Sequence, residues 1–358
     1  MPIGVLADGR LPLPWLDGPL QRADALVNSH ALLLCGPAGA GHLELALLLA
    51  QGQLCEARAP GAGLRPCGRC ASCHLVRGRS HPDLLLVLPE ALRVQLGWVG
   101  DDEGRLTKAD AKPSKDLKVE QLRQAIAWTQ QTSGRGQGKV LLLHPADALN
   151  ITSANALLKT LEEPPGGLRI LLTSTDPERL LPTVRSRCQR LALGLPPPDQ
   201  AAAWLRQQGL ADDDAAALLA ATSDSPLEAL TWAAEGWSAE LLATLPARVA
   251  GGDATLLSGR ALPRVIDLLL KIAHDGLARA VGGAARFFPQ ARWPAGADLA
   301  ALVAWQKALL RAARHDEHPW NAGLLLESLV IQAAACWPAA QAAGVQRSGQ
   351  GASLHSAR

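Results

Sequence analysis

A glycine-rich segment near the N-terminus has the residues of a phosphate-binding loop but lacks its charged and metal-binding groups. An apolar run at residues 32–35 precedes Gly36, Gly39 and Gly41, and an apolar, helix-like stretch follows. In a working loop the backbone N–H groups cradle the phosphates, a Lys neutralises their charge and a Ser or Thr hydroxyl binds Mg²⁺. His42 and Leu43 occupy those two positions, so we expect no ATP or Mg²⁺ to be bound productively. The motif alone leaves open a glycine-rich turn that never bound a nucleotide.

The carboxylates that ATP hydrolysis requires are also missing. A phosphate-loop ATPase needs a strand that ends in Asp, usually Asp-Glu, to hold Mg²⁺ and orient the attacking water. After the apolar run at residues 140–143 the chain has His144 and Pro145, and Asp147 follows three residues too late. The combined loss indicates a phosphate-loop fold that was kept while hydrolysis was discarded.

Four of the seven cysteines lie close together, at Cys55, Cys67, Cys70 and Cys73, with gaps of eleven, two and two residues. Two Cys-x-x-Cys steps allow the sulfurs to converge, and four thiolates make a closed tetrahedral site, so we predict a structural zinc. Reduced free thiols are the alternative. His74 and His81 could each replace a thiolate, although His74 adjoins Cys73 and is the geometrically weaker candidate.

Arginines surround this cysteine module, and they raise the question of nucleic-acid contact. Five of them could touch phosphate, but no aromatic residue lies between Cys55 and His81 to stack on a base. We therefore do not expect DNA binding by the module. The five are Arg58, Arg65, Arg69, Arg77 and Arg79.

Alternating strands and helices must position these groups. Short aliphatic runs at 31–34, 140–143 and 170–172 are typical of strands buried on both faces of a parallel sheet, with helices at 43–50 and 153–161 covering it. In the second helix Ala154, Leu157, Leu158 and Leu161 form one apolar stripe, Thr152 or Ser153 can cap the start, and Pro164 stops it. The fold class is α/β.

Composition changes along the chain predict four parts. Residues 1–195 form the α/β domain with the cysteine module at 55–73, and the proline run at 196–198 opens a small helical domain at 196–242. An all-helical domain follows at 243–342, and the polar tail 343–358 lacks the composition of a folded segment. Residues 100–118 are a polar insertion without apolar periodicity.

Global properties exclude few functions. The net charge is +2 over 358 residues, so a polyanion-coating protein is not indicated. Residues 1–15 lack the pattern of a secretory signal, and no apolar stretch approaches the ~20 residues that span a bilayer. We expect a cytoplasmic protein with no membrane partner.

Three segments carry a resemblance to a known family. Residues 155–165 read NALLKTLEEPP, residues 172–176 read LTSTD, and Ser186, Arg187 and Cys188 follow. Together they resemble the bacterial clamp-loader branch of the AAA+ ATPases, firmly over residues 15–235 and in outline beyond. The resemblance implies an AAA+ domain followed by a helical lid and an oligomerisation collar.

The same resemblance implies roles for individual residues. His144 and Pro145 stand where the active members have Asp-Glu, and Leu227 stands where they have a sensor arginine. Arg187, with Ser186 and Cys188 shaping its turn, matches the arginine finger that acts on a neighbouring subunit's γ-phosphate. Without the motif, Arg187 would be one member of a solvated basic edge with Arg185 and Arg190.

The implied function is that of a non-catalytic subunit of the DNA polymerase III clamp loader. Such a subunit serves as stator and arginine-finger donor, assembles with gamma/tau motor subunits and a delta subunit, and acts on the sliding clamp and primed DNA through the complex. Two other classes stay open: a phosphate-loop ATPase with unusual ligands and a zinc-dependent nucleic-acid-binding module.

Overall fold

The chain separates into two compact units, Met1–Pro196 and Pro197–Arg358. The structure is a computed structural model that describes residues 4–6, 8–58, 63–98, 113–314 and 321–338. The predicted tail 343–358 and residues 100–112 of the predicted insertion lie outside the described residues. The separation of a lid at 196–242 from a collar at 243–342 stays a prediction.

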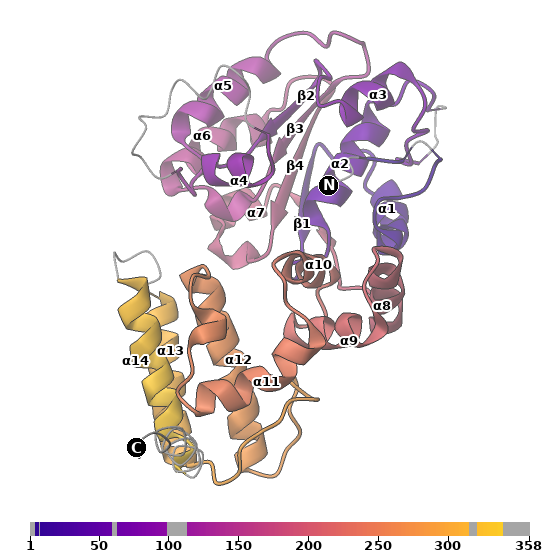
Figure 1. Ribbon diagram of the computed structural model, residues 1–358. Helices are drawn as coiled ribbons and strands as arrows, with labels where there is room; N and C mark the ends of the chain where they lie inside the picture. Colours follow the sequence, from indigo (N-terminus) through magenta and orange to yellow (C-terminus); the bar gives the residue numbers. More distant parts are fainter. Residues whose placement is uncertain (1–3, 7, 59–62, 99–112, 315–320, 339–358) are drawn as a thin grey trace, which may run out of the picture. The chain divides into compact units, whose positions relative to one another are not determined.

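A five-stranded parallel sheet forms the centre of the first unit (Figure 1). The strands follow the order β2-β3-β4-β1-β5, and every neighbouring pair is parallel. Their bounds are β1 Ala31–Cys35, β2 Leu84–Val87, β3 Lys139–Leu143, β4 Leu168–Ser174 and β5 Gln189–Ala192. The α/β class with a parallel sheet is confirmed.

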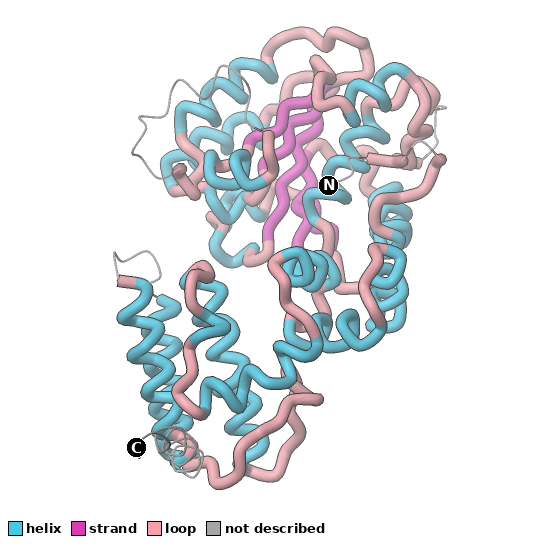
Figure 2. The backbone as a smooth tube through the Cα atoms, viewed as in Figure 1, coloured by secondary structure: helices cyan, strands magenta, loops and turns pink. Residues whose placement is uncertain are grey.

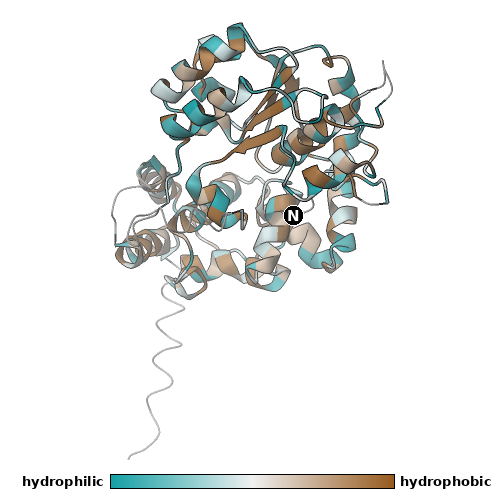
Figure 3. Cartoon of the chain, turned by 90° about the horizontal axis from the view of Figure 1, so that it is seen from above, coloured by the Kyte–Doolittle hydropathy of each residue, from teal (hydrophilic) through white to brown (hydrophobic). Residues whose placement is uncertain are grey.

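The three inner strands are the ones that the aliphatic runs predict. Residues of β3 and β4 are buried throughout, and Figure 3 shows the apolar colour of the strands. Strand β5 was not predicted, because this edge strand buries only Leu191 and has no apolar run. Strand β2 was also missed, although its sequence is apolar.

Helices cover both faces of the sheet. Figure 1 places α1 Asp17–Asp24, α2 His42–Gln53 and α3 Ala71–Arg77 on one side, and α5 Val119–Thr129, α6 Ile151–Glu162 and α7 Pro182–Arg185 on the other. A short helix, α4 Glu90–Gln95, follows β2. The N-cap of α6 is Asn150, whose side chain accepts from Ser153 N at 2.8 Å, so the proposed caps Thr152 and Ser153 were wrong.

Helices joined by loops make up the described residues of the second unit, which contain no strand (Figure 2). Trp232, Trp305 and Trp337 are among its fully buried side chains. None of the described helices is both long enough and apolar enough to pass through a membrane. The helices are α8 Pro198–Gln207, α9 Asp212–Ala221, α10 Pro226–Ala234, α11 Ala239–Ala250, α12 Leu262–Ala280, α13 Leu299–Arg314 and α14 Ala322–Ala335.

Candidate functional site

The glycine-rich loop joins the carboxyl end of β1 to the start of α2, and its glycines are needed for packing. Gly41 is the N-cap of α2 with a φ of 94°, in the left-handed region that favours glycine. A Cβ on Gly36 would lie 2.2 Å from the carbonyl oxygen of Leu193. The indole Nε1 of Trp15 donates to Ala40 O at 3.0 Å. These contacts account for Gly36 and Gly41 without a bound phosphate.

Neutral side chains fill the two positions that should carry charge and hydroxyl. His42 begins α2 and is 5% exposed, and Leu43 is equally buried. Burial lowers the pKa of His42, an effect that the charge of Asp147 opposes in part. The Nε2 atom of His42 has no hydrogen-bond partner among the described residues. The imidazole is therefore neutral near pH 7 and cannot replace a fixed ammonium.

His144 lies where the Mg²⁺-binding carboxylate is expected, at the end of β3. Its Nδ1 atom is 2.6 Å from Thr173 Oγ1 on β4. Burial, together with repulsion from His42, lowers the pKa of His144 to about 4, although the Asp147 charge raises it. The side chain is thus a neutral hydrogen-bonding group between two strands.

Asp147, the nearest carboxylate in sequence, is engaged in holding a turn. It accepts hydrogen bonds from the hydroxyl of Ser174, from Thr175 N at 2.9 Å and from Thr175 Oγ1 at 3.1 Å. These groups follow or end β4, so Asp147 fixes the β4 turn instead of standing free for a metal.

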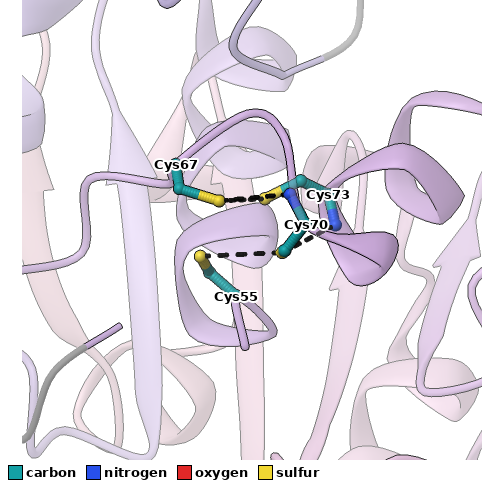
Figure 4. Close-up of side chains that lie close together, drawn as sticks. All are labelled: Cys55, Cys67, Cys70 and Cys73. Atoms are coloured by element: carbon teal, nitrogen blue, oxygen red, sulfur yellow. Dashed lines mark hydrogen bonds between the residues drawn. The ribbon is translucent and has the colours of Figure 1, made fainter. Parts of the chain in front are cut away.

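The four predicted cysteines come together (Figure 4). All four sulfurs lie within 4.8 Å of one another, and the pairs Cys55–Cys70 and Cys67–Cys73 are each 3.9 Å apart. A regular tetrahedron with metal–sulfur bonds of about 2.3 Å has sulfurs about 3.8 Å apart. The cluster therefore has the size of a Cys₄ metal site, and four protein ligands would leave no position for water or substrate.

Backbone donors prepare part of this cluster for negative charge. Cys67 Sγ accepts from Cys70 N at 3.3 Å and from Arg69 N at 3.5 Å. Burial raises the pKa of Cys67, but these N–H groups outweigh it and lower the pKa to about 6. Burial instead raises the pKa of Cys55 and Cys73. A metal that requires thiolates would supply the charge that these buried sulfurs lack.

A polar network that the sequence did not reveal attaches the cysteine module to the sheet. Arg135, which precedes β3, donates to Glu56 Oε1 at 2.5 Å and 2.8 Å and to Ser72 Oγ at 3.1 Å. His81 Nε2 lies 3.0 Å from Ser72 Oγ, and its Nδ1 accepts from Asp83 N at 3.0 Å. His81 is therefore a bridge between the module and β2, away from the cysteine sulfurs.

Most arginines of the module have partners within the chain. Arg65 pairs with Asp17 at 2.5 Å, Arg77 lies 2.6 Å from His74 Nδ1, and Arg79 stacks 4.3 Å from the centre of the Trp98 ring. Trp98 lies beyond the segment from Cys55 to His81, in which the sequence has no aromatic residue. These contacts hold the three side chains against their own chain.

Arg187 lies on a turn between α7 and β5. Its Nη1 donates to Thr183 O at 2.8 Å, and its Nη2 lies 2.5 Å from Glu162 Oε1. The Arg187 side chain is 33% exposed. Ser186 closes α7, and the buried Cys188 turns the chain back into the core. In the predicted triplet Ser186 is exposed, Arg187 is partly exposed and Cys188 is buried.

The position of the sensor arginine lies in the second unit. Ser225 caps α10 through its hydroxyl, which accepts from Glu228 N at 3.3 Å. Leu227, the next residue but one, is partly buried in the first turn of α10. Its aliphatic side chain has no group that could contact a phosphate.

Sequence comparisons decide the family. Residues 22–196 match the family model described as DNA polymerase III, delta subunit. The DNA polymerase III subunit delta' of Escherichia coli is 30% identical over 283 residues, which cover 76% of this chain and 78% of that protein. The chain belongs to the DNA polymerase III delta-prime family. The family that the motifs indicated is confirmed.

Two further relatives define the extent of this similarity. The delta-prime subunit of Pseudomonas aeruginosa is 40% identical over 205 residues, and the match spans 55% of that relative's length and 56% of this chain. The tau subunit of Escherichia coli is 35% identical over 164 residues, which are 46% of this chain and 21% of tau. The similarity of this delta-prime family member to tau thus covers less than half of the chain.

The neutral histidines predict an acid-sensitive fold. The unfolded chain takes up a proton on His144 near pH 6.5, whereas the folded chain does so only near pH 4. Stability is therefore unaffected above pH 6.5 and falls between pH 6.5 and 4, by up to about 3 kcal/mol from this group. Urea unfolding at several pH values should show a flatter decline for His144→Asn than for the unmodified chain. Exposed His30, changed to Asn, is the control, and equal slopes for all three proteins would contradict the assignment.

Proposed function

We propose that this delta-prime family member is a non-catalytic subunit of the DNA polymerase III clamp loader. It would act as stator and arginine-finger donor while the complex loads the sliding clamp on primed DNA. The proposal rests on the contrast between a neutral, packed loop at His42 and Leu43 and a partly exposed arginine at Arg187.

The strand register supports action on another chain. Gln189, two residues after Arg187, pairs with Leu32, so Arg187 lies level with the start of β1. The chain's own glycine-rich loop begins at Gly36, beyond the other end of β1. At about 3.3 Å per residue, roughly 15–20 Å of sheet separates the two, more than an arginine side chain spans. A phosphate that Arg187 contacts would therefore belong to a neighbour.

The missing chemistry supports a role without ATP hydrolysis by this chain. His42 and His144 are neutral, Leu43 offers no oxygen, and Asp147 is bound to the β4 turn. No group is left at these positions to neutralise a γ-phosphate or to ligate Mg²⁺.

The expected partners are gamma/tau motor subunits and a delta subunit. The similarity to tau supports a shared architecture, in which subunits with related domains sit side by side. In the second unit, helices α13 and α14 expose several large apolar side chains, which suits burial in an oligomeric collar. They are Leu299, Val303, Leu310, Leu324 and Ile331.

The finger role predicts a specific loss in the complex. Arg187→Ala should leave folding and assembly intact and lower the DNA-stimulated ATPase of the reconstituted clamp loader by about tenfold or more, since such fingers contribute ~10³ or more at their site. Exposed Arg190, changed to Ala, is the matched control and should have little effect. An unchanged rate for Arg187→Ala in a verified complex would exclude the finger role, and equal losses for both would indicate a general basic edge.

We further assign the Cys₄ cluster to structural zinc. Cys55, Cys67, Cys70 and Cys73 would hold the ion, which supplies charge neutralisation and a cross-link between α2 and α3. The network of Glu56 and Arg135 then connects this module to the sheet.

Metal removal predicts a loss of stability. The purified chain should contain one zinc per molecule, and strong chelators or Cys70→Ser should remove it and lower the unfolding midpoint by about 5–10 °C. Metal content by mass spectrometry and thermal unfolding by circular dichroism measure the two effects. Cys35→Ser, outside the cluster, should keep both values. Full stability in a zinc-free chain would refute a structural role.

A further inference from the structure

The guanidinium of Arg187 is held by acceptors from its own chain. Thr183 O accepts from Nη1 at 2.8 Å, Ser186 Oγ lies 3.4 Å from the same nitrogen, and Glu162 Oε1 accepts from Nη2 at 2.5 Å. Thr183 lies in α7 and Ser186 ends that helix just before Arg187, whereas Glu162 is 25 residues away. Glu162 is therefore the acceptor that ties the outer end of the arginine to a second element.

Both members of this pair stand on anchored backbone. Glu162 ends α6 directly after the buried Leu161, and Arg187 precedes the buried Cys188. Leu161, Cys188 and Val184 of α7 belong to one core cluster. Burial raises the pKa of Cys188 to about 12, so it is a neutral packed thiol. The remaining conformational freedom lies in the side chains of Arg187 and Glu162, and their ion pair restricts it.

Local energetics give little reason for a glutamate at this position. The C-terminus of a helix carries partial negative charge, so a carboxylate there is in the unfavourable place. The pair is also solvent-accessible, with side-chain exposures of 33% for Arg187 and 49% for Glu162, and such pairs contribute little to folding stability. The favourable consequence of the contact is the restricted orientation of the guanidinium.

We propose that Glu162 is a positioning residue for Arg187, an inference that rests on the finger role proposed above. The carboxylate fixes the orientation of the guanidinium before the neighbouring nucleotide arrives, so less conformational freedom is lost when Arg187 meets the γ-phosphate. Among the described residues, Arg187 Nε and the second N–H of Nη2 have no other acceptor, so donors remain for a phosphate oxygen.

If Glu162 instead sequesters Arg187 from the phosphate, removing Glu162 should change the ATPase rate in the opposite direction. If Glu162 competed with the phosphate for Arg187, removing its charge would raise the ATPase rate. If it positions Arg187, removing its oxygen lowers the rate, and Gln, which keeps a carbonyl acceptor at the same reach, restores most of it.

The test compares three variants in the reconstituted complex with its motor and delta partners. Glu162→Ala should lower the DNA-stimulated kcat about three- to fivefold with KM for ATP and assembly unchanged, a size set by the modest strength of an exposed pair. Glu162→Gln should retain most of the rate. Glu163→Ala, which removes the adjacent exposed carboxylate, is the matched control and should have no effect.

A double variant and a spectroscopic readout complete the design. If Glu162 acts through Arg187, Glu162→Ala should have no further effect in an Arg187→Ala background. In the isolated full chain, ¹⁵N NMR of the arginine side chains should show a more mobile Arg187 signal in Glu162→Ala, with Arg187→Lys used to assign it.

The outcomes separate the inference from the function on which it rests. A large loss for Arg187→Ala with no loss for Glu162→Ala, or additive losses in the double variant, would overturn the positioning role alone. A faster complex for Glu162→Ala would establish sequestration instead. An unchanged rate for Arg187→Ala would overturn both, whatever the NMR result.

Discussion

Uncharged side chains are buried at the carboxyl end of the parallel sheet, and this burial determines what the glycine-rich loop can bind. A phosphate-binding loop needs charge and open donors where this chain has His42 and Leu43 packed at the start of α2. Burial keeps His42 and His144 neutral, and the glycines that remain serve close backbone packing. In this structure the end of the loop at His42 and Leu43 is packed into the apolar core, which fits the proposal that the loop does not hold Mg²⁺ and a γ-phosphate.

The sheet divides the remaining features between its two edges. The glycine-rich loop, His144 and the β4 turn lie at the carboxyl ends of strands. Asp83 and Arg135, which attach the cysteine module, precede β2 and β3 and so lie at the amino ends. Arg187 precedes β5 and shares that amino edge. The glycine-rich loop and Arg187 thus lie at opposite ends of the parallel strands, which fits the proposed action of Arg187 on a neighbouring subunit.

Much of this arrangement follows from local pattern. Short aliphatic runs predicted β1, β3 and β4 because strands buried on both faces need no polar alternation. Cysteine spacing predicted the cluster because the two Cys-x-x-Cys steps keep Cys67, Cys70 and Cys73 close together along the chain. Strand β5 had no such signal, because this edge strand buries only one of its four residues and is held by its backbone pairing with β1.

Pairings between distant residues could not be predicted. Glu56 and Arg135 are 79 residues apart, and the motifs that contain Glu162 and Arg187 give no sign that the two side chains meet. Those contacts depend on how α6, α7 and the loop before β3 pack, which a single sequence does not encode as a local pattern.

Calorimetric titration of the purified chain with ATP and Mg²⁺ measures whether the glycine-rich loop binds a nucleotide. We expect no Mg²⁺-dependent binding, because the loop lacks both the ammonium and the metal ligands. Tight, Mg²⁺-dependent binding of one ATP per chain would contradict this expectation and would make this protein a nucleotide-binding subunit with unusual ligands.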